Sequence, residues 1–382
     1  MYKRTLFIKI FPYLLSIIAV MITVFTLEFI LSKTYSKEIE LNWQTNSTSG
    51  NDSTFRLDSD LIYSLKPNAH SYWETDEFIE SVSINSIGLR NQEIDQNDKF
   101  NVLVLGDSFT FGHGVSLEAS YPKRLEKLIK DAGLKNVQVI NAGIKGYNLE
   151  QEYRFFTERL SSIKPKLLII TLGRGDYDWS DYPLYAVKNN QLEKLKATRT
   201  WLYIQAYLYN IAPDWLRKSF LFRYFLISLA GKNYYNLNPF STDKITTPKS
   251  NDEFISMSLL LLNNLKEKCE ENGCHILVVI APFDTMGEFN EKSEFNSKYG
   301  SLSQFKVLLK NNRIDFVDSN QIEYIDEKNE ELVPEQLDFK WNQFSFKNDT
   351  HLTEEGNLLF ALIVKKYLIE NYLLPLNSIE KK

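Results

Sequence analysis

Five apolar runs, each followed by a residue that turns the chain, constrain this fold more than any other feature. The runs read FNVLVLG, NVQVINAG, KLLIITLG, HILVVIAP and RIDFVDS, and the first begins at Phe100. Gly106, Gly143, Gly173 and Pro282 end the first four. Continuous runs rich in Val, Ile and Leu are typical of strands that are covered on both faces. The five runs therefore predict one sheet buried between helices.

Segments with helical periodicity alternate with these runs. SLEASYPKRLEKLIKDAG ends at Gly133, and NDEFISMSLLLLNNLKEKCEENG ends at Gly273, a residue type that commonly follows a helix. LTEEGNLLFALIVKKYLIENYLL is the last such segment, with Thr353 as its expected N-cap. The alternation predicts a parallel sheet with right-handed crossovers, an α/β domain made of residues 100–177 and 251–373.

The N-terminal segment is apolar over a length that suits a membrane. Residues Ile10 to Leu27 carry no charge, and the apolar run resumes after Glu28. A helix of this length can cross a hydrocarbon core of about 30 Å, whereas the apolar region of a cleaved signal peptide is usually shorter. We therefore expect a transmembrane helix over residues 10–31 rather than a buried core helix.

The segments that flank this helix suggest how the chain is arranged. Basic residues before the helix favour cytoplasmic residues 1–9 and an extracytoplasmic remainder, either periplasmic or at the cell surface. Residues 32–60 end in a stretch dominated by Asn, Ser, Thr and Asp, which predicts a flexible tether. Residues 61–99 contain short apolar pieces with alternation in SVSINSI, which predicts a small irregular β lead-in.

Residues 178–250 interrupt the alternation between the third and fourth strands. Their middle, Trp201 to Gly231, is crowded with aromatic residues and predicts two helices broken at Pro213. We favour a satellite core packed on the main domain. A membrane-facing amphipathic pair is the alternative, because basic residues stand among the apolar ones. These basic residues are Arg217, Lys218 and Arg223.

The composition narrows the classes of partner and cofactor. The net charge is −5 and no basic tract is present, so we expect no nucleic-acid partner. Cys269 and Cys274 form a short-loop disulfide in an oxidising compartment or are two small buried apolar side chains, and the sequence leaves both interpretations open. The cysteine and histidine spacing does not suit a structural zinc site, and we expect no metal.

A serine follows the first predicted strand, and a histidine precedes the last predicted helix. Ser108 stands in LGDSFTFGHGV, and functional sites of open α/β sheets form at the carboxyl ends of the strands. A nucleophilic serine needs a base. His351 in NDTHLTEEG can return to the strand ends, and His113 lies in the same loop as Ser108. Each signal is weak alone, since Ser and Asp are also ordinary turn residues.

Four blocks taken in order resemble the SGNH, or GDSL, hydrolase family. They are LGDSFTFGHGV, NAGIKGYNLEQE, TLGRGDYDW and NDTHLTEEG, and they follow the first three strands and enter the last helix. The lead-in SINSIGLRNQE is similar to that of membrane-anchored bacterial members. The resemblance covers residues 61–178 and 252–372. It implies a three-layer, flavodoxin-like parallel sheet and the hydrolysis or transfer of acyl esters without a cofactor, often acetyl groups on carbohydrates.

The resemblance implies a role for several residues. Ser108 matches the nucleophile and its backbone N–H the first oxyanion donor, Gly146 matches the second donor, and His351 matches the general base. The third oxyanion position holds Gly175 where the family has Asn. Losing one such donor typically reduces turnover by about 10²–10³-fold. Three neighbouring polar residues are expected to bind substrate: Asp107, Arg174 and Asp176.

The residue that orients the histidine is the second departure from the family pattern. The family has Asp three positions before the histidine, where this chain has Asn348. Asp349 stands two positions before His351 and takes the role if the backbone allows it; otherwise Asn348 is the orienting residue. In a serine protease triad, a change from Asp to Asn reduced kcat by about 10⁴-fold.

Two functions follow from these residues. The first is a membrane-anchored serine esterase or O-acyltransferase that acts on acyl, foremost acetyl, esters of an envelope glycan or glycolipid. The alternative is a catalytically degenerate, carbohydrate-binding module in an envelope polysaccharide assembly system. Gly175 and Asn348 favour the alternative, whereas Ser108, Gly146 and His351 oppose it. The sequence does not identify a protein partner.

Overall fold

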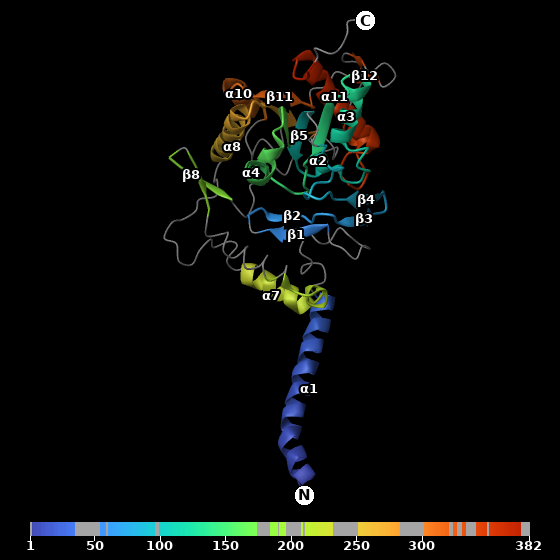
Figure 1. The fold of residues 1–382 in the computed structure, drawn as a ribbon, viewed down its shortest axis with the longest axis vertical. Helices are drawn as coiled ribbons and strands as arrows, with labels where there is room; N and C mark the ends of the chain where they lie inside the picture. The colour runs from blue at the N-terminus through green and yellow to red at the C-terminus, as the bar shows by residue number, and fades with distance from the viewer. Residues whose placement is uncertain are drawn as a thin grey trace.

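The structure is a computed structural model of all 382 residues. The structure describes residues 2–34, 54–58, 60–95, 99–173, 184–189, 191–195, 208, 211–231, 251–282, 302–320, 324–326, 331–333, 341–349 and 351–375. Figure 1 shows a folded domain beyond the C-terminal end of one long helix, α1 (Tyr2–Thr34).

A five-stranded parallel sheet forms the centre of the domain. Its strands are β5 (Phe100–Gly106), β6 (Val137–Asn141), β7 (Leu167–Leu172), β10 (His275–Ile280) and β11 (Asp315–Asp318). They lie in the order β11-β10-β7-β5-β6, with every neighbouring pair parallel. The chain order across the sheet is therefore 2-1-3-4-5, the flavodoxin-like order, in which ligands bind where the order reverses, between β5 and β7. The predicted fold class is confirmed.

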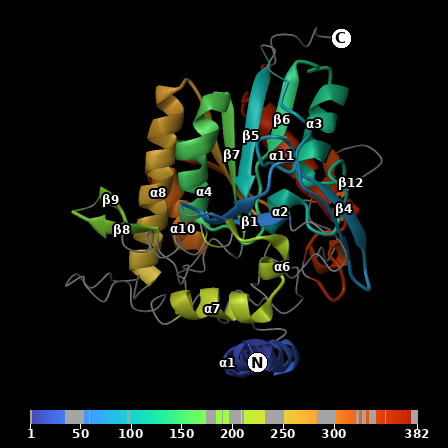
Figure 2. The ribbon, with the colours of Figure 1, turned by 60° about the horizontal axis from the view of Figure 1, so that its bottom comes forward.

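Helices cover both faces of the sheet, which makes three layers (Figure 2). On one face, α3 (Tyr121–Asp131) and α11 (Glu354–Glu370) pack on each other. On the other, α8 (Asn251–Glu271) contacts both α4 (Leu149–Phe155) and α10 (Leu302–Asn311).

Alternate residues of each strand enter opposite cores. In β5, Leu103 and Leu105 belong to one buried cluster, while Val102 and Val104 belong to the other. This double burial is why the strands are continuously apolar in sequence.

The helix ends follow the sequence signals. Gly133 has φ 97° after α3, and Gly273 has φ 67° after α8, a backbone region that glycine adopts without strain. The Thr353 hydroxyl accepts a hydrogen bond from the Gly356 N–H at 3.3 Å and caps α11.

The lead-in consists of two antiparallel hairpins. β1 (Phe55–Asp58) pairs with β2 (Ile62–Leu65), and β3 (His70–Glu74) pairs with β4 (Ile79–Ser83). The predicted boundary of the tether at residue 60 is wrong, because β1 lies inside the range assigned to the tether. Phe55 is 8% exposed and belongs to the domain core, so apolar burial draws this segment into the fold.

The insertion is not entirely helical. It contains a β-hairpin, β8 (Tyr185–Lys188) with β9 (Gln191–Lys194), which contacts α8. Two helices follow, α6 (Asp214–Arg217) and α7 (Phe220–Gly231). Leu208 and Ile211 are helical, so the predicted break at Pro213 is present: Pro213 precedes α6, where its missing N–H costs no hydrogen bond. A further break, at Lys218 and Ser219, separates α6 from α7. Of residues 201–210, only position 208 is described.

The N-terminal helix is longer than predicted. α1 (Tyr2–Thr34) includes residues that we expected to flank the span, because Lys and Arg are good helix formers. Within it, Leu15–Lys33 is long and apolar enough to cross a membrane, and it is almost entirely exposed.

Shorter elements connect these parts. They are α2 (Ser108–Phe111), the π-helix Phe156–Leu160, the 3₁₀ helices Ser161–Ile163 and Trp341–Phe344, and the hairpin of β12 (Tyr324–Asp326) with β13 (Glu331–Val333).

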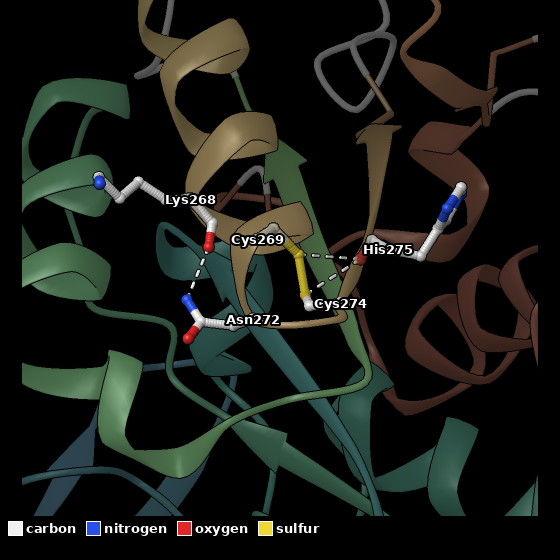
Figure 3. The surroundings of a disulfide bond; sticks show 5 residues. All are labelled: Lys268, Cys269, Asn272, Cys274 and His275. Carbon is white, nitrogen blue, oxygen red and sulfur yellow. Dashed lines mark hydrogen bonds between the residues drawn. A yellow bond between two sulfur atoms is a disulfide. The ribbon is translucent and has the colours of Figure 1, made fainter.

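Cys269 and Cys274 form a disulfide between the end of α8 and the start of β10 (Figure 3). Their Cα atoms are 4.8 Å apart, and both residues are buried. The sulfur atoms lie 3.3 and 3.4 Å from the His275 carbonyl oxygen, contacts that are packing because a disulfide has no S–H to donate. Of the two interpretations left open by the sequence, the structure has the disulfide.

Candidate active site

Ser108 lies in a tight turn at the carboxyl end of β5. Gly106 has φ 152°, and a Cβ there would lie 2.1 Å from the Thr110 hydroxyl oxygen, so only glycine fits. The buried Asp107 carboxylate accepts a hydrogen bond from the Phe109 N–H at 2.9 Å and caps α2. Because α2 begins at Ser108, the hydroxyl is held at the edge of the sheet where the strand order reverses. A role of Asp107 in substrate binding stays a prediction.

His351 reaches this serine from the other end of the domain. It lies in the histidine loop, which we define as the segment between the bridged residues Ser345 and Leu352, just before α11. The Phe346 N–H donates to the His351 carbonyl at 2.9 Å and closes the loop. His351 Nε2 lies 2.6 Å from Ser108 Oγ, although 243 residues separate them. The structure therefore brings the two predicted residues together.

Asp349, rather than Asn348, lies behind the imidazole. Its Oδ1 accepts the His351 backbone N–H at 2.9 Å and also contacts Nδ1 of the ring. The first bond is an Asx-turn, in which a carboxylate bonds the N–H two residues later, and this turn allows an Asp at that spacing to reach the ring. The exposed Asn348 has its backbone N–H on Glu77 Oε2 at 2.9 Å.

Hydrogen bonds keep the Asp349 carboxylate ionised. Burial alone would raise its pKa, but hydrogen bonds from His113 and His351, together with the charge of His351, hold the pKa well below its usual range. The anionic oxygen at Nδ1 favours the tautomer with the proton on that nitrogen. Nε2 is then the acceptor for the Ser108 hydroxyl proton.

A second histidine contacts the same carboxylate. His113 Nε2 lies 3.3 Å from Asp349 Oδ2, and its ring meets the His351 ring edge to face at 4.5 Å between centroids. Burial lowers the pKa of His113 to about 4. His113 is therefore neutral at pH 7, and its contact with Asp349 is a hydrogen bond rather than an ion pair.

Two residues of the lead-in form hydrogen bonds to the nucleophile loop, which we define as residues 107–115. Arg90 donates to the Phe111, Gly112 and Val115 carbonyls, each at 2.7 Å. It also forms a fully buried ion pair with Glu80 of β4, whose Oε2 accepts the Gly114 N–H at 2.9 Å. Burial raises the pKa of Glu80 to about 7 and lowers that of Arg90, and the opposite charge of each partner offsets part of these shifts.

The hairpin of β3 and β4 also contacts the histidine loop. Glu77 accepts the backbone N–H groups of Lys347 and Asn348 at 2.8 and 2.9 Å. Phe78 packs on both His113 and Phe346, with ring centroids 5.1 and 4.9 Å away. One hairpin thus supports both loops that carry the site.

The expected oxyanion residues are only partly described. Gly146 is exposed with φ 71° in the loop after β6, next to the nucleophile turn, because the Ile144 N–H donates to the Gly106 carbonyl at 3.0 Å. Its role as second oxyanion donor stays a prediction. Gly175, Arg174 and Asp176 lie outside the described residues.

Three residues at the site were not assigned a role from sequence: Arg90, His113 and Lys145. Burial lowers the pKa of Lys145 to about 7, with Glu80 and Asp349 acting in the opposite direction. The family-like lead-in SINSIGLRNQE contained Arg90, and GIKGYN contained Lys145, but a motif does not show which side chains are buried. Of the three, His113 had the clearest sequence signal for a place at the site, since it is five residues from Ser108.

The site also has the ligand spacing of a metal centre. His113, Asp349 and His351 each offer a ligand atom, and these atoms lie within 4.8 Å of one another. A metal there would have to replace the hydrogen bonds that join these side chains. We therefore describe the group as a hydrogen-bonded serine, histidine and carboxylate arrangement, which has the chemistry of nucleophilic catalysis.

Comparison with known proteins gives one family match. Residues 104–218 match the model of the GDSL-like lipase/acylhydrolase family. No curated protein sequence matches the chain.

Among solved structures, the chain is similar to a lipolytic protein of the G-D-S-L family from Desulfitobacterium hafniense (15% identity, 70% of this chain and 99% of that chain, TM-score 0.34). It is also similar to a lipase/acylhydrolase from Enterococcus faecalis (14%, 71% and 96%, TM-score 0.39) and to an acetyl xylan esterase (14%, 70% and 99%, TM-score 0.38). The matched segment begins in β5, the strand that precedes Ser108, and runs through β6 and β7. The segment of residues 104–218 is what this chain shares with the GDSL-like lipase/acylhydrolase family.

Proposed function

We propose that this protein is a serine esterase or O-acyltransferase, held at a membrane by α1, that acts on acyl esters of an envelope carbohydrate or glycolipid. The family match over residues 104–218 supports a hydrolase that acts on esters. The observation that carries the proposal is the continuous line of contact from Asp349 through His351 to Ser108.

The chemistry follows from the positions of the protons. His351 Nε2 takes the hydroxyl proton of Ser108 as Oγ attacks the ester carbonyl carbon. Asp349 stabilises the resulting imidazolium through Nδ1. As the tetrahedral intermediate collapses, the C–O bond to the alcohol breaks and His351 returns the proton to the leaving oxygen. The acyl group is then esterified to Ser108.

The second half of the cycle distinguishes the two activities. Water or a sugar hydroxyl gives its proton to His351 and attacks the acyl-enzyme carbonyl. As the second tetrahedral intermediate collapses, the bond from the acyl carbon to Ser108 Oγ breaks and His351 returns the proton to that oxygen. Water gives hydrolysis, and an alcohol gives acyl transfer. The preference for acetyl esters of carbohydrates rests on the resemblance of the sequence blocks.

Two observations support a location outside the cytoplasm. The Leu15–Lys33 segment is long and apolar enough to cross a membrane. The Cys269–Cys274 disulfide favours an oxidising compartment, because cytosolic thiols are usually kept reduced. With basic residues before the span, we propose a cytoplasmic N-terminus and an extracytoplasmic domain.

Labelling with a fluorophosphonate probe, together with hydrolysis of p-nitrophenyl acetate, tests the proposal. We expect the wild-type chain to be labelled and Ser108→Ala to be neither labelled nor active. Ser162→Ala is the matched control, because Ser162 is exposed at the opposite end of the sheet, and it should behave as the wild type does. Equal labelling of wild type and Ser108→Ala would contradict the proposal.

A binding module without catalysis is the competing function. Its main argument was Asn348 at the orienting position, and the contacts of Asp349 with His351 weaken that argument. Its second argument, Gly175, lies outside the described residues. If the native chain is inert on acetyl esters yet binds acetylated oligosaccharide, the module is correct and the esterase is not.

A further inference from the structure

Glu28 is the only acidic residue of the candidate span Leu15–Lys33, and its carboxylate has distant partners. Oε1 accepts the Phe220 N–H at 2.6 Å, and Oε2 accepts the Leu221 N–H and the Ser219 hydroxyl, both at 2.9 Å. These partners lie more than 190 residues away, at the start of α7. An ionisable residue within a span is costly unless it is paired, so these contacts need a functional explanation.

The carboxylate acts as a cap for α7. The first four N–H groups of a helix have no partner within the helix. Glu28 satisfies those of Phe220 and Leu221, and the Ser219 hydroxyl accepts that of Phe222 at 3.2 Å. A negative charge at a helix N-terminus is also favourable to the helix dipole. α1 and α7 are therefore joined by this polar contact at Glu28.

The position of Glu28 along α1 fixes the depth of this contact. Glu28 lies five residues before Lys33, the end of the span, which is about 7 Å along a helix. Interfacial helices bury their apolar face to a depth of about 5–10 Å in the boundary between headgroups and acyl chains. Figure 1 shows α7 lying across the end of α1 that is nearer the domain, and the two helices are in contact.

The side chains of this region suit the surface of a bilayer. α7 reads FLFRYFLISLAG, and Phe225 is 52% exposed. Just before it, Trp215 of α6 is 74% exposed, and Trp and Tyr are enriched where membranes meet water. Arg217 and Lys218 precede α7, and basic residues near an apolar helix attract anionic headgroups.

We propose that α7, with α6, is an interfacial membrane helix whose N-terminus is clamped to the anchor by Glu28, and that its partner is the lipid bilayer surface. This inference rests on the proposed anchoring by α1 and is independent of the esterase chemistry. Because α7 contacts the bilayer in addition to the anchor α1, the domain cannot rotate freely about the axis of α1. Figure 1 shows the β1–β2 hairpin on the side of the domain that faces α7, with α2 further from α7 in the domain.

Spin labels on the full-length chain in phosphatidylglycerol-containing vesicles test the inference. The two native cysteines are joined, so a single added cysteine can be labelled selectively. Phe225→Cys reports on α7, and Val307→Cys, at a 55% exposed residue of α10 far from α1, is the matched control. We expect the label at 225 to be at least about tenfold less accessible to an aqueous nickel chelate than the label at 307, because its site lies in the interface.

A second variant tests the clamp itself. Glu28→Leu keeps the span apolar and the anchor intact but removes the cap, so the label at 225 should gain access to the chelate while the chain still floats with the vesicles. Unchanged shielding in Glu28→Leu would overturn the clamp.

Equal accessibility at 225 and 307 in a chain that floats would overturn the interfacial helix and leave the anchor standing. Failure to float would overturn both. Fluorophosphonate labelling of Ser108 in the same samples reports on the esterase proposal separately.

Discussion

The two loops that meet at the site are held in different ways. The nucleophile loop is buried, and its carbonyls and the Gly114 N–H are bonded to the Arg90–Glu80 ion pair, which is itself inaccessible to water. The histidine loop is half-exposed and depends on Glu77 and on the Asx-turn of Asp349. Segments with few buried contacts open most easily. The serine is thus held by buried contacts, and the base is held by more exposed ones.

The largest expected effect is on the orientation of the base. Asp349→Asn removes the charge that stabilises the imidazolium, so kcat/KM for p-nitrophenyl acetate should fall by about 10⁴-fold, as in a serine protease triad. Asn348→Ala, at an exposed neighbour with no such contact, should change it by no more than about twofold. The reverse ranking would show that Asn348 orients His351.

The next effect is on the buried support of the nucleophile loop. Arg90→Met leaves the buried Glu80 carboxyl and three carbonyls of the nucleophile loop without their partner, which should lower the free energy of unfolding by about 3–5 kcal/mol. Arg124→Met removes an exposed ion pair with Glu354 and should cost no more than about 1 kcal/mol. Chemical denaturation of both variants measures the difference, and equal losses would show that the two loops are supported alike.

The third prediction concerns acid. The pKa of His113 is lowered from 6.5 to about 4, so between these values the unfolded chain binds more protons and stability falls as the pH falls. The full shift in the His113 pKa corresponds to a loss on the order of 3 kcal/mol in the free energy of unfolding. His113→Gln, which does not titrate, should remove this part of the pH dependence. Denaturant midpoints measured from pH 7 to pH 4 provide the check, and parallel curves for the two proteins would contradict it.

The smallest effect is expected at the exposed support of the histidine loop. Glu77→Ala removes two hydrogen bonds to backbone N–H groups, each worth about 1 kcal/mol. Because these bonds hold the loop and not the core, kcat should fall about five- to tenfold, with the unfolding midpoint changing little. A loss of stability as large as that of Arg90→Met would remove the distinction between the loops.

The sequence contained enough to predict the sheet and the two reacting residues. Continuous apolar runs report burial on both faces, and residues after parallel strands lie at one edge, so Ser108 and His351 were expected together. The choice between Asp349 and Asn348 was not decidable in this way. It depends on an Asx-turn geometry, which the spacing permits but does not require.

The sequence by itself determined what is local: strands from continuous apolar runs, helix ends from Gly133, Gly273 and Thr353, and an apolar helix long enough to span a membrane. Tertiary structure alone decided which distant groups meet, such as Arg90 with the nucleophile loop, and Glu28 with the start of α7. The physical reason is that periodicity and capping act over a few residues. The partner of a buried charge or of an N–H at a helix end can be distant in sequence, because it is whichever group the folded chain places beside it.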